Sequence, residues 1–387
     1  MHNSLAAEKR VRSHGHTAGT AEESGHNVRV HTANTASHGD HGENTKPSAE
    51  HAENAEKEFQ TPDLTPTGGA HDATPNSELR TPNSELRTPN SELRTPNSEL
   101  RTPMQAPFAR LIDLDGAWPT DILGAGNHLD RRAWGPRIRY CAPAREIEAF
   151  WAETSASVAP FTLYGSGDYH HLSALWLRPL REPFTLISFD NHPDWDTRPP
   201  AWCCGTWLNQ AFRQPQLETV IVWGCANFEL NAPHRWFGNQ KAVAAGRLLL
   251  MPWRDRFSHS AQRRYPGITA DTWRAEFTRR LGQMRGRSVY VTIDMDCLQP
   301  GDAVTDWEQG LFTVEDVAWA LNELRRETRV AGGDLCGAHS PAAYVRWTQR
   351  KNATMDHPKK PPVDPQTALR TNLRAFQRIW PALTGQK

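Results

Sequence analysis

The sequence predicts an α/β fold, a three-layer αβα sandwich with a mostly parallel central sheet. Short apolar runs rich in β-branched residues alternate with segments of helical periodicity through the second part of the chain. Strands that are apolar on both faces are typical of parallel sheets that helices cover on both sides. Acidic and histidine side chains directly follow several of the apolar runs, and ligands gather in such sheets beyond the carboxyl ends of the strands.

The elements alternate along the chain. The run 184–190 is short, apolar and preceded by proline, which predicts a buried strand. Trp273, Phe277 and Leu281 recur at helical spacing and predict a helix over 270–284. Further strands are expected over 161–165, 219–223, 247–250, 288–294 and 329–335, and further helices over 144–157, 205–213 and 313–326, with another that begins within 171–177.

The chain of 387 residues divides by composition near residue 103. Residues 1–103 contain one aromatic side chain, Phe59, whereas all 15 tryptophans come later, so this part cannot bury enough apolar surface to fold. Four tandem copies of TPNSELR fill 74–101, and a proline in every copy excludes a coiled coil. We expect 1–103 to be a disordered low-complexity extension, either natural or upstream DNA read as protein, with Met104 as the biological start and one domain over 104–387.

Charge and composition exclude several classes of protein. The 44 basic and 44 acidic side chains balance, which gives no reason to expect nucleic acid or a membrane surface as a partner. No apolar run reaches 18 residues, and the first 30 residues lack the apolar core of a secretory signal. The six cysteines form no CxxC pair, which favours a reducing compartment. We therefore expect a cytoplasmic protein with a small-molecule substrate, and homo-oligomerisation is left open.

The strand 184–190 ends in a cluster of candidate metal ligands. Asp190, His192 and Asp194 occupy every second position, and such side chains of an extended segment point to the same side. Two carboxylates and an imidazole in one place would repel or desolvate one another unless a cation joined them. Asp196 is a further carboxylate nearby, and the alternative is a polar, solvated loop.

Two more clusters strengthen this interpretation. Asp294 and Asp296 end the strand 288–294, and the glycine-flanked run YGSGDYHHLS carries His170 and His171, of which one is expected to be a ligand. Hard oxygen ligands with two nitrogens suit a pair of Mn²⁺-like ions, with Zn²⁺ or Fe²⁺ as alternatives. Two such ions would lower the pKa of a shared water and present hydroxide to an electrophilic carbon. The candidate ligands are His170, His171, Asp190, His192, Asp194, Asp294 and Asp296.

These motifs resemble those of the arginase–agmatinase–deacetylase superfamily, the ureohydrolases. The run DNHPD at 190–194 is similar to the family's Asp-Ala-His-x-Asp motif, and TIDMDCLQP at 292–300 to its Ser-x-Asp-x-Asp-x-x-Asp-Pro motif. The run 166–168 is similar to the start of Gly-Gly-Asp-His-Ser, although Tyr169 precedes His170. The three motifs occur in the family's order. The resemblance implies an arginase-like fold and a binuclear metal site.

The departures from the family's pattern bear on chemistry. Cys204 stands where the resemblance implies a proton-shuttling histidine, and Gly337 stands where guanidino-cleaving members carry a glutamate that pairs with the substrate. His339 follows two residues later and is a candidate general acid/base, with a hydrogen-bonded loop histidine as the alternative. Cys204 could act as a nucleophile with His339, but adjacent cysteines such as Cys203 and Cys204 are more often buried small hydrophobes.

The resulting hypothesis is a metallohydrolase that cleaves a C–N bond of amide, amidine or ureido type through a metal-bridging hydroxide. Because of Gly337, arginine and agmatine are not the expected substrates. One alternative is a non-catalytic descendant of the fold that binds metal or another ligand. The other is a single-zinc amide deacetylase.

Overall fold

The structure is a computed structural model that describes residues 108–386. The expected extension over 1–103, its repeats and Met104 lie outside the described residues. All six cysteines lie inside them and are free and buried. Among residues 108–386, no helix is both long and apolar enough to span a membrane.

One eight-stranded sheet organises this part of the chain, in the order β2-β1-β3-β8-β7-β4-β5-β6. Every neighbouring pair is parallel, which confirms the predicted fold class. The carboxyl ends of all strands therefore share one edge of the sheet. The strands are β1 (Ala109–Asp113), β2 (His128–Asp130), β3 (Phe161–Leu163), β4 (Phe184–Phe189), β5 (Leu217–Trp223), β6 (Leu248–Met251), β7 (Ser288–Asp294) and β8 (Arg329–Cys336).

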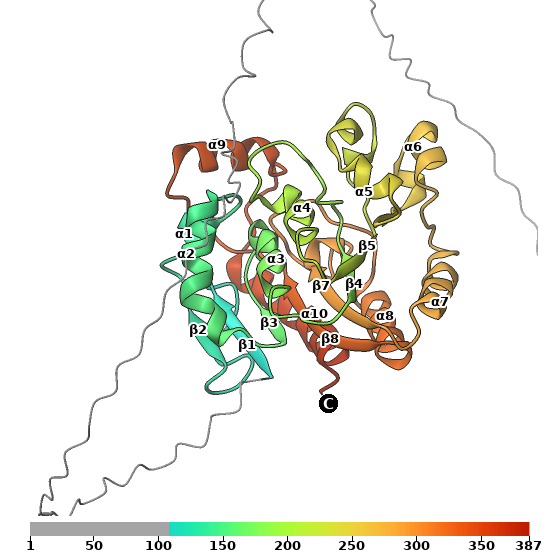
Figure 1. Ribbon diagram of the computed structural model, residues 1–387. Coiled ribbons are helices and arrows are strands. Elements are labelled where there is room, and N and C mark those ends of the chain that lie inside the picture. The colour runs from blue at the N-terminus through green and yellow to red at the C-terminus, as the bar shows by residue number, and fades with distance from the viewer. Residues whose placement is uncertain (1–107, 387) are drawn as a thin grey trace, which may run out of the picture. The chain divides into compact units, whose positions relative to one another are not determined.

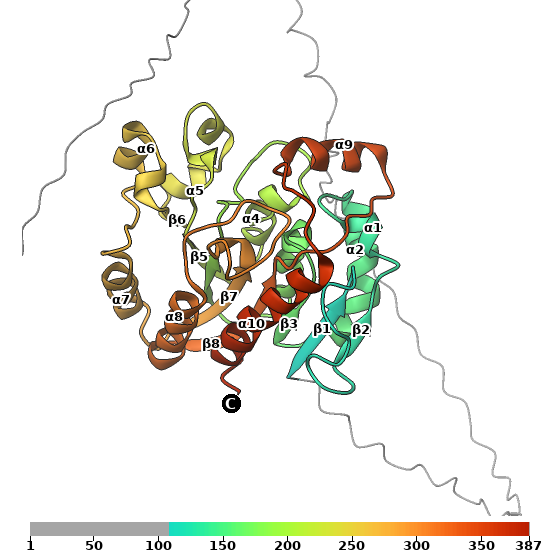
Figure 2. The ribbon, with the colours of Figure 1, turned by 180° about the vertical axis from the view of Figure 1, so that it is seen from behind.

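Helices cover both faces of the sheet, which makes the three predicted layers (Figures 1 and 2). One apolar core joins the sheet to α7, α8 and α10, and the other joins it to α1–α6. The helices are α1 (Gly135–Ile138), α2 (Ala144–Thr154), α3 (Ser173–Trp176), α4 (Leu208–Ala211), α5 (Gln240–Ala244), α6 (His259–Arg264), α7 (Trp273–Gln283), α8 (Val314–Glu327), α9 (Trp347–Asp356) and α10 (Pro365–Thr384).

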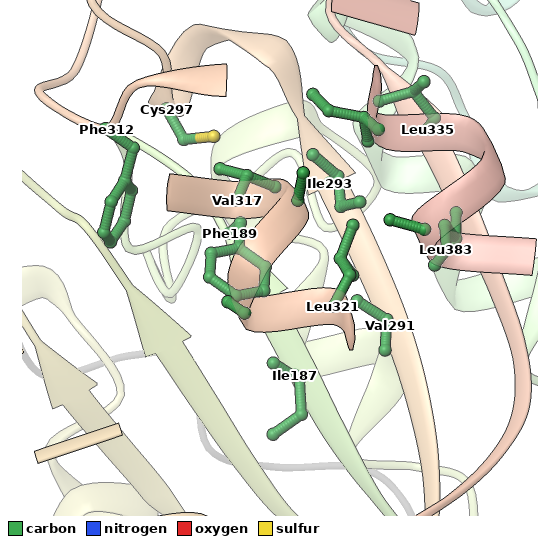
Figure 3. Packing of buried hydrophobic residues seen from close by; sticks show 14 of the residues in the cluster. Ile187, Phe189, Val291, Ile293, Cys297, Phe312, Val317, Leu321, Leu335 and Leu383 are labelled. Atoms are coloured by element: carbon green, nitrogen blue, oxygen red, sulfur yellow. The ribbon is translucent and has the colours of Figure 1, made fainter. Parts of the chain in front are cut away.

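The two central strands, β4 and β7, are buried along their whole length. Figure 3 shows Val317 and Leu321 of α8 beside the strand residues Phe189 and Ile293. Burying one such aliphatic or aromatic side chain contributes about 1.5–3 kcal/mol. Dense packing on both faces holds the ends of these strands in place, and the candidate ligands follow those ends.

Most expected elements are present with shifted ends, and several elements are additional. The helix expected from 171 begins earlier, as a 3₁₀ turn over Gly167–Leu172 that leads into α3. β2 has only three residues, too few for a periodicity to show. α10 contains Pro381, whose missing N–H and ring disfavour a helix interior, yet it buries a long apolar face against α8.

Candidate metal centre

The register of the central strands brings distant acids together. Phe189 of β4 lies opposite Ile293 of β7. Asp190 directly follows β4 and Asp294 is the last residue of β7, so both stand at the same edge of the sheet. Both carboxylates are buried.

One group of donor atoms surrounds His170. Its Nδ1 lies 3.1 Å from Asp194 Oδ2, 3.2 Å from Asp190 Oδ2 and 3.7 Å from Asp294 Oδ2. All four side chains are buried. Donor atoms of His170, Asp190 and Asp194 all lie within 4.8 Å of one another, as the ligands of a single cation do.

A second group surrounds His192. Its Nδ1 lies 2.8 Å from Asp296 Oδ2 and 3.6 Å from Asp190 Oδ1. Asp190 thus belongs to both groups, through one oxygen in each. A carboxylate in this place can join two neighbouring cations.

The loop after β4 differs from the expected extended segment. The strand ends at Phe189, the backbone N–H of His192 donates to Asp190 Oδ1, and Asp194 adopts a left-handed φ of 47°. The loop is folded, so the alternation of an extended chain does not explain the cluster. Instead, the folded loop places Asp194 beside His170 and His192 beside Asp296.

Both imidazoles are oriented by contacts on their outer nitrogens. His170 Nε2 lies 2.9 Å from Thr292 Oγ1, and this hydroxyl donates to Asp334. His192 Nε2 lies 3.3 Å from Glu308 Oε2. Histidines that ligate metals are usually held in this way, because the outer partner sets the tautomer and the ring orientation.

Burial, and then repulsion between neighbouring carboxylates, raises the pKa values of several acids of the cluster. Burial, and then the neighbouring carboxylate of Asp190, raises the pKa of Asp194 to about 8. Burial also raises the pKa of Asp296 to about 6. Burial alone would lower the pKa of the His170 and His192 imidazoles, but the carboxylates around them outweigh it and hold both pKa values well above the usual range.

The donor set fits divalent cations. Asp190 Oδ2 is buried and, within the described part of the chain, accepts no hydrogen bond. An unpaired buried carboxylate oxygen is costly, and a cation between it and His170 would satisfy it. Carboxylate oxygens with one imidazole in each group suit Mn²⁺, Fe²⁺ or Zn²⁺. The role of these residues as ligands stays a prediction.

A cavity of about 510 Å³ opens over both donor groups. Its wall includes further acids, Glu229, Glu308 and Asp356, and its rim carries the exposed apolar side chains of Phe228 and Met355. Asp356 and Met355 belong to α9, so this helix forms part of the wall. Asp196 also lines the cavity and pairs with Arg198.

His171 lies apart from both donor groups. It is fully buried, and neither ring nitrogen has a hydrogen-bond partner among residues 108–386. Burial lowers the pKa of this imidazole to about 3, so it stays neutral. Of the two adjacent histidines, the structure brings only His170 to the carboxylates.

His339 belongs to a buried ion-pair network beside the cavity. Its Nδ1 lies 2.6 Å from Asp306 Oδ1, and Asp306 also pairs with Arg139 at 2.9 Å. Arg139 Nε in turn pairs with Asp168 Oδ2 at 2.7 Å. His339 is absent from the residues that line the cavity, and its ring is hydrogen-bonded to Asp306. Its role as a general acid/base stays a prediction.

Cys204 does line the cavity, and its Sγ lies 4.0 Å from Cys203 Sγ. The Cys203 contact, with burial, raises the pKa of the Cys204 thiol well above its usual range. A protonated thiol is a poor nucleophile, so this environment favours packing over covalent catalysis.

The sequence patterns did not indicate three residues that line the cavity or contact a candidate ligand. Trp307 and Glu308 lie in the long loop between β7 and α8, where no periodicity marks them. Cys336 ends β8, and its Sγ lies 3.6 Å from Asp294 Oδ2. The rule that ligands follow parallel strands, applied to β8, would have found it.

Comparisons with known proteins give distant similarities. No family model matches the chain. An uncharacterized protein of Thermotoga maritima is 26% identical over 196 residues, which are 50% of this chain and 64% of that protein, so the match spans just under two thirds of its length. A hypothetical agmatinase from Burkholderia thailandensis has 18% identity and a TM-score of 0.34, covering 60% of this chain and 65% of its own.

Proclavaminate amidino hydrolase from Streptomyces clavuligerus has 15% identity and a TM-score of 0.42, covering 73% of this chain and 94% of its own. The resemblance of this chain to the ureohydrolases rests on its own sequence motifs. Because these similarities are so distant, the activity of this chain is inferred only from its own residues.

Replacing Gly337 by alanine is expected to weaken metal binding by about tenfold or more. Gly337 has a φ of +98°, and a Cβ there would lie 2.2 Å from Asp294 Oδ1 and 2.5 Å from the backbone nitrogen of Met295. The carboxylate would have to move. Competition titration with a chelating dye measures the affinity, and Gly282→Ala, which has nothing within 4 Å, is the matched control. Equal affinity in both variants would contradict this geometry.

Metal affinity is expected to rise between pH 6 and pH 8. Asp194, with a pKa of about 8, and Asp296, with a pKa of about 6, must lose their protons to bind a cation. The imidazoles of His170 and His192, whose pKa values are held well above the usual range, must also lose protons to bind it. Each displaced proton makes the affinity about tenfold stronger per pH unit below its pKa. Titration calorimetry in buffers of different ionisation enthalpy counts the released protons. An affinity independent of pH over this range would rule out the raised pKa values.

Proposed function

We propose that this chain is a metal-dependent hydrolase that cleaves a C–N bond of amide, amidine or ureido type in a small molecule. The observation that carries the proposal is Asp190, which is shared by two donor groups at the floor of a cavity. The cavity of about 510 Å³ has the size of small-molecule sites. The free, buried state of all six cysteines supports a reducing, cytoplasmic location.

The proposed ligands hold two divalent cations, Mn²⁺ by the oxygen-rich donor set, with Zn²⁺ or Fe²⁺ as alternatives. When bound, such cations lower the pKa of water and polarise a carbonyl or C=N carbon. Thr292 and Glu308 keep the imidazoles of His170 and His192 turned toward the centre. The wall residue Trp195 is buried against the cavity and limits the access of bulk water.

Glu229 is the proposed proton carrier, in place of His339 and Cys204. Burial raises the pKa of this carboxyl to about 7, which suits transfer in both directions at neutral pH. Asn227 Nδ2 donates to Glu229 Oε1 at 3.1 Å and holds the carboxyl at the cavity wall. Glu229 would take a proton from the attacking water and give one to the departing nitrogen.

The end of β8 supports a substrate other than arginine or agmatine. A carboxylate at position 337 would pair with a guanidinium, but Gly337 has no room even for a Cβ beside Asp294. The remaining wall acids are engaged as well: Glu308 by His192, Asp356 by the hydroxyl of Tyr140 and Asp196 by Arg198. The substrate is therefore proposed to present its carbonyl or amidine carbon without a guanidinium clamp.

A panel of N-acyl amines, ureides and amidines tests the proposed function on the full chain loaded with Mn²⁺ or Zn²⁺. Turnover of at least one compound is expected, and Asp296→Asn should lower kcat/KM by roughly a hundredfold or more because it removes a ligand. The exposed Asp271→Asn is the matched control and should keep the parent rate. Bound metal without turnover of any compound would favour the non-catalytic binding module, and one bound zinc would favour the deacetylase.

Replacing Glu229 by glutamine is expected to lower kcat by about 10²–10⁴-fold and to remove the limb of the pH–rate profile near pH 7. The amide cannot exchange a proton at this pH. Glu218→Gln, the same change at an exposed position of β5, should leave the profile intact. Metal content by mass spectrometry checks that both variants keep the centre. A pH profile of Glu229→Gln like that of the parent would exclude the proton carrier.

A further inference from the structure

A buried thiol lies against the first donor group. Cys336 is the last residue of β8 and pairs in register with Asp294, the last residue of β7. Residues opposite each other in parallel strands point to the same face of a sheet. Cys336 is fully buried, and its Sγ lies 3.6 Å from Asp294 Oδ2. Donor atoms of His170, Asp294 and Cys336 all lie within 4.8 Å of one another.

We propose that Cys336 is an additional, thiolate ligand of the cation held by His170. The inference rests on the proposed metal centre. It implies that the two metal positions, one at His170 and one at His192, have different sets of ligands. The position at His170 would combine nitrogen, oxygen and sulfur donors, whereas the group formed by Asp190, His192 and Asp296 has nitrogen and oxygen alone. Thiolate favours Zn²⁺, Fe²⁺ or Co²⁺, and carboxylate oxygens suit Mn²⁺. The centre would then hold a softer ion at the first position and Mn²⁺ at the second.

Coordination replaces one bond by another. The S–H proton leaves to water, and the sulfur lone pair forms the bond to the cation, with no change of oxidation state. Without coordination, the thiol would instead donate a weak hydrogen bond to Asp294 Oδ2, the geometry in which the two atoms stand. These two roles of Cys336 predict different spectra.

The neighbouring backbone makes this close approach feasible. Gly337 follows Cys336 with a φ of +98°, and the position of its missing Cβ is filled by Asp294 Oδ1 and the nitrogen of Met295. β8 therefore lies against the end of β7 as closely as the backbone allows. Cys225 and Cys297 are equally buried but join no donor group among residues 108–386, so they serve as matched controls.

Cobalt substitution of the full chain tests the proposal, with a phosphine reductant in place of thiols that would bind cobalt. The parent and Cys225→Ser are expected to show a near-ultraviolet thiolate-to-Co²⁺ charge-transfer band, and Cys336→Ser and Cys336→Ala to lack it. In competition between equal concentrations of Zn²⁺ and Mn²⁺, the parent should retain about one zinc ion. In Cys336→Ser, the preference for Zn²⁺ over Mn²⁺ should fall by about tenfold. Elemental analysis counts the ions, and circular dichroism checks folding.

Bound cobalt without the band in the parent would overturn the thiolate ligand and leave the metal centre standing. A band that persists in Cys336→Ser would also overturn it, by assigning the sulfur to another cysteine. A parent chain that takes up no Co²⁺, Zn²⁺ or Mn²⁺ would overturn both the proposed function and this inference. None of these readouts depends on turnover, so failure to find a substrate does not affect the result.

Discussion

The site depends on the repulsion among acidic side chains that the fold crowds into one buried place. Asp190, Asp194, Asp294 and Asp296 end or follow the neighbouring strands β4 and β7, and the imidazoles of His170 and His192 lie among them. Burying carboxylates so close together is unfavourable unless positive charge neutralises them. The raised pKa values of Asp194 and Asp296 reflect this cost of burial, and bound divalent cations would neutralise the carboxylates instead of protons.

The scaffold can hold this arrangement because the strands beneath it have little freedom. β4 and β7 are covered by helices on both faces. Beside them, the buried guanidinium of Arg139 pairs with the carboxylates of Asp115, Asp168 and Asp306. Burial opposes the charge on Asp168, but Arg139 and His357 hold the pKa of its carboxyl down at about 2. Asp168 anchors the 3₁₀ turn that delivers His170. Apolar packing thus holds the strands β4 and β7, and the ion pairs of Arg139 hold the turn that carries His170.

Local patterns were enough for the sheet and for most of the candidate ligands. Short apolar runs that lead into Asp190 and Asp294 placed both acids at strand ends, and parallel topology placed those ends together. The sequence could not choose between His170 and His171, because that choice depends on how a 3₁₀ turn rotates each ring. Glu308 could not be weighed either, since its contact with His192 arises from loop folding that no local periodicity encodes.

The tight junction of Gly337 with Asp294 also limits how this chain could change its specificity. A glutamate at 337, which the resemblance to guanidino-cleaving enzymes would call for, would occupy the space of the proposed ligand Asp294. Acquiring a guanidinium clamp would therefore require the end of β8 to be rebuilt before the glutamate appeared. Under the proposed function, one backbone position therefore affects both the substrate and the metal ligands, so a single substitution to glutamate at 337 would not give this scaffold arginase chemistry.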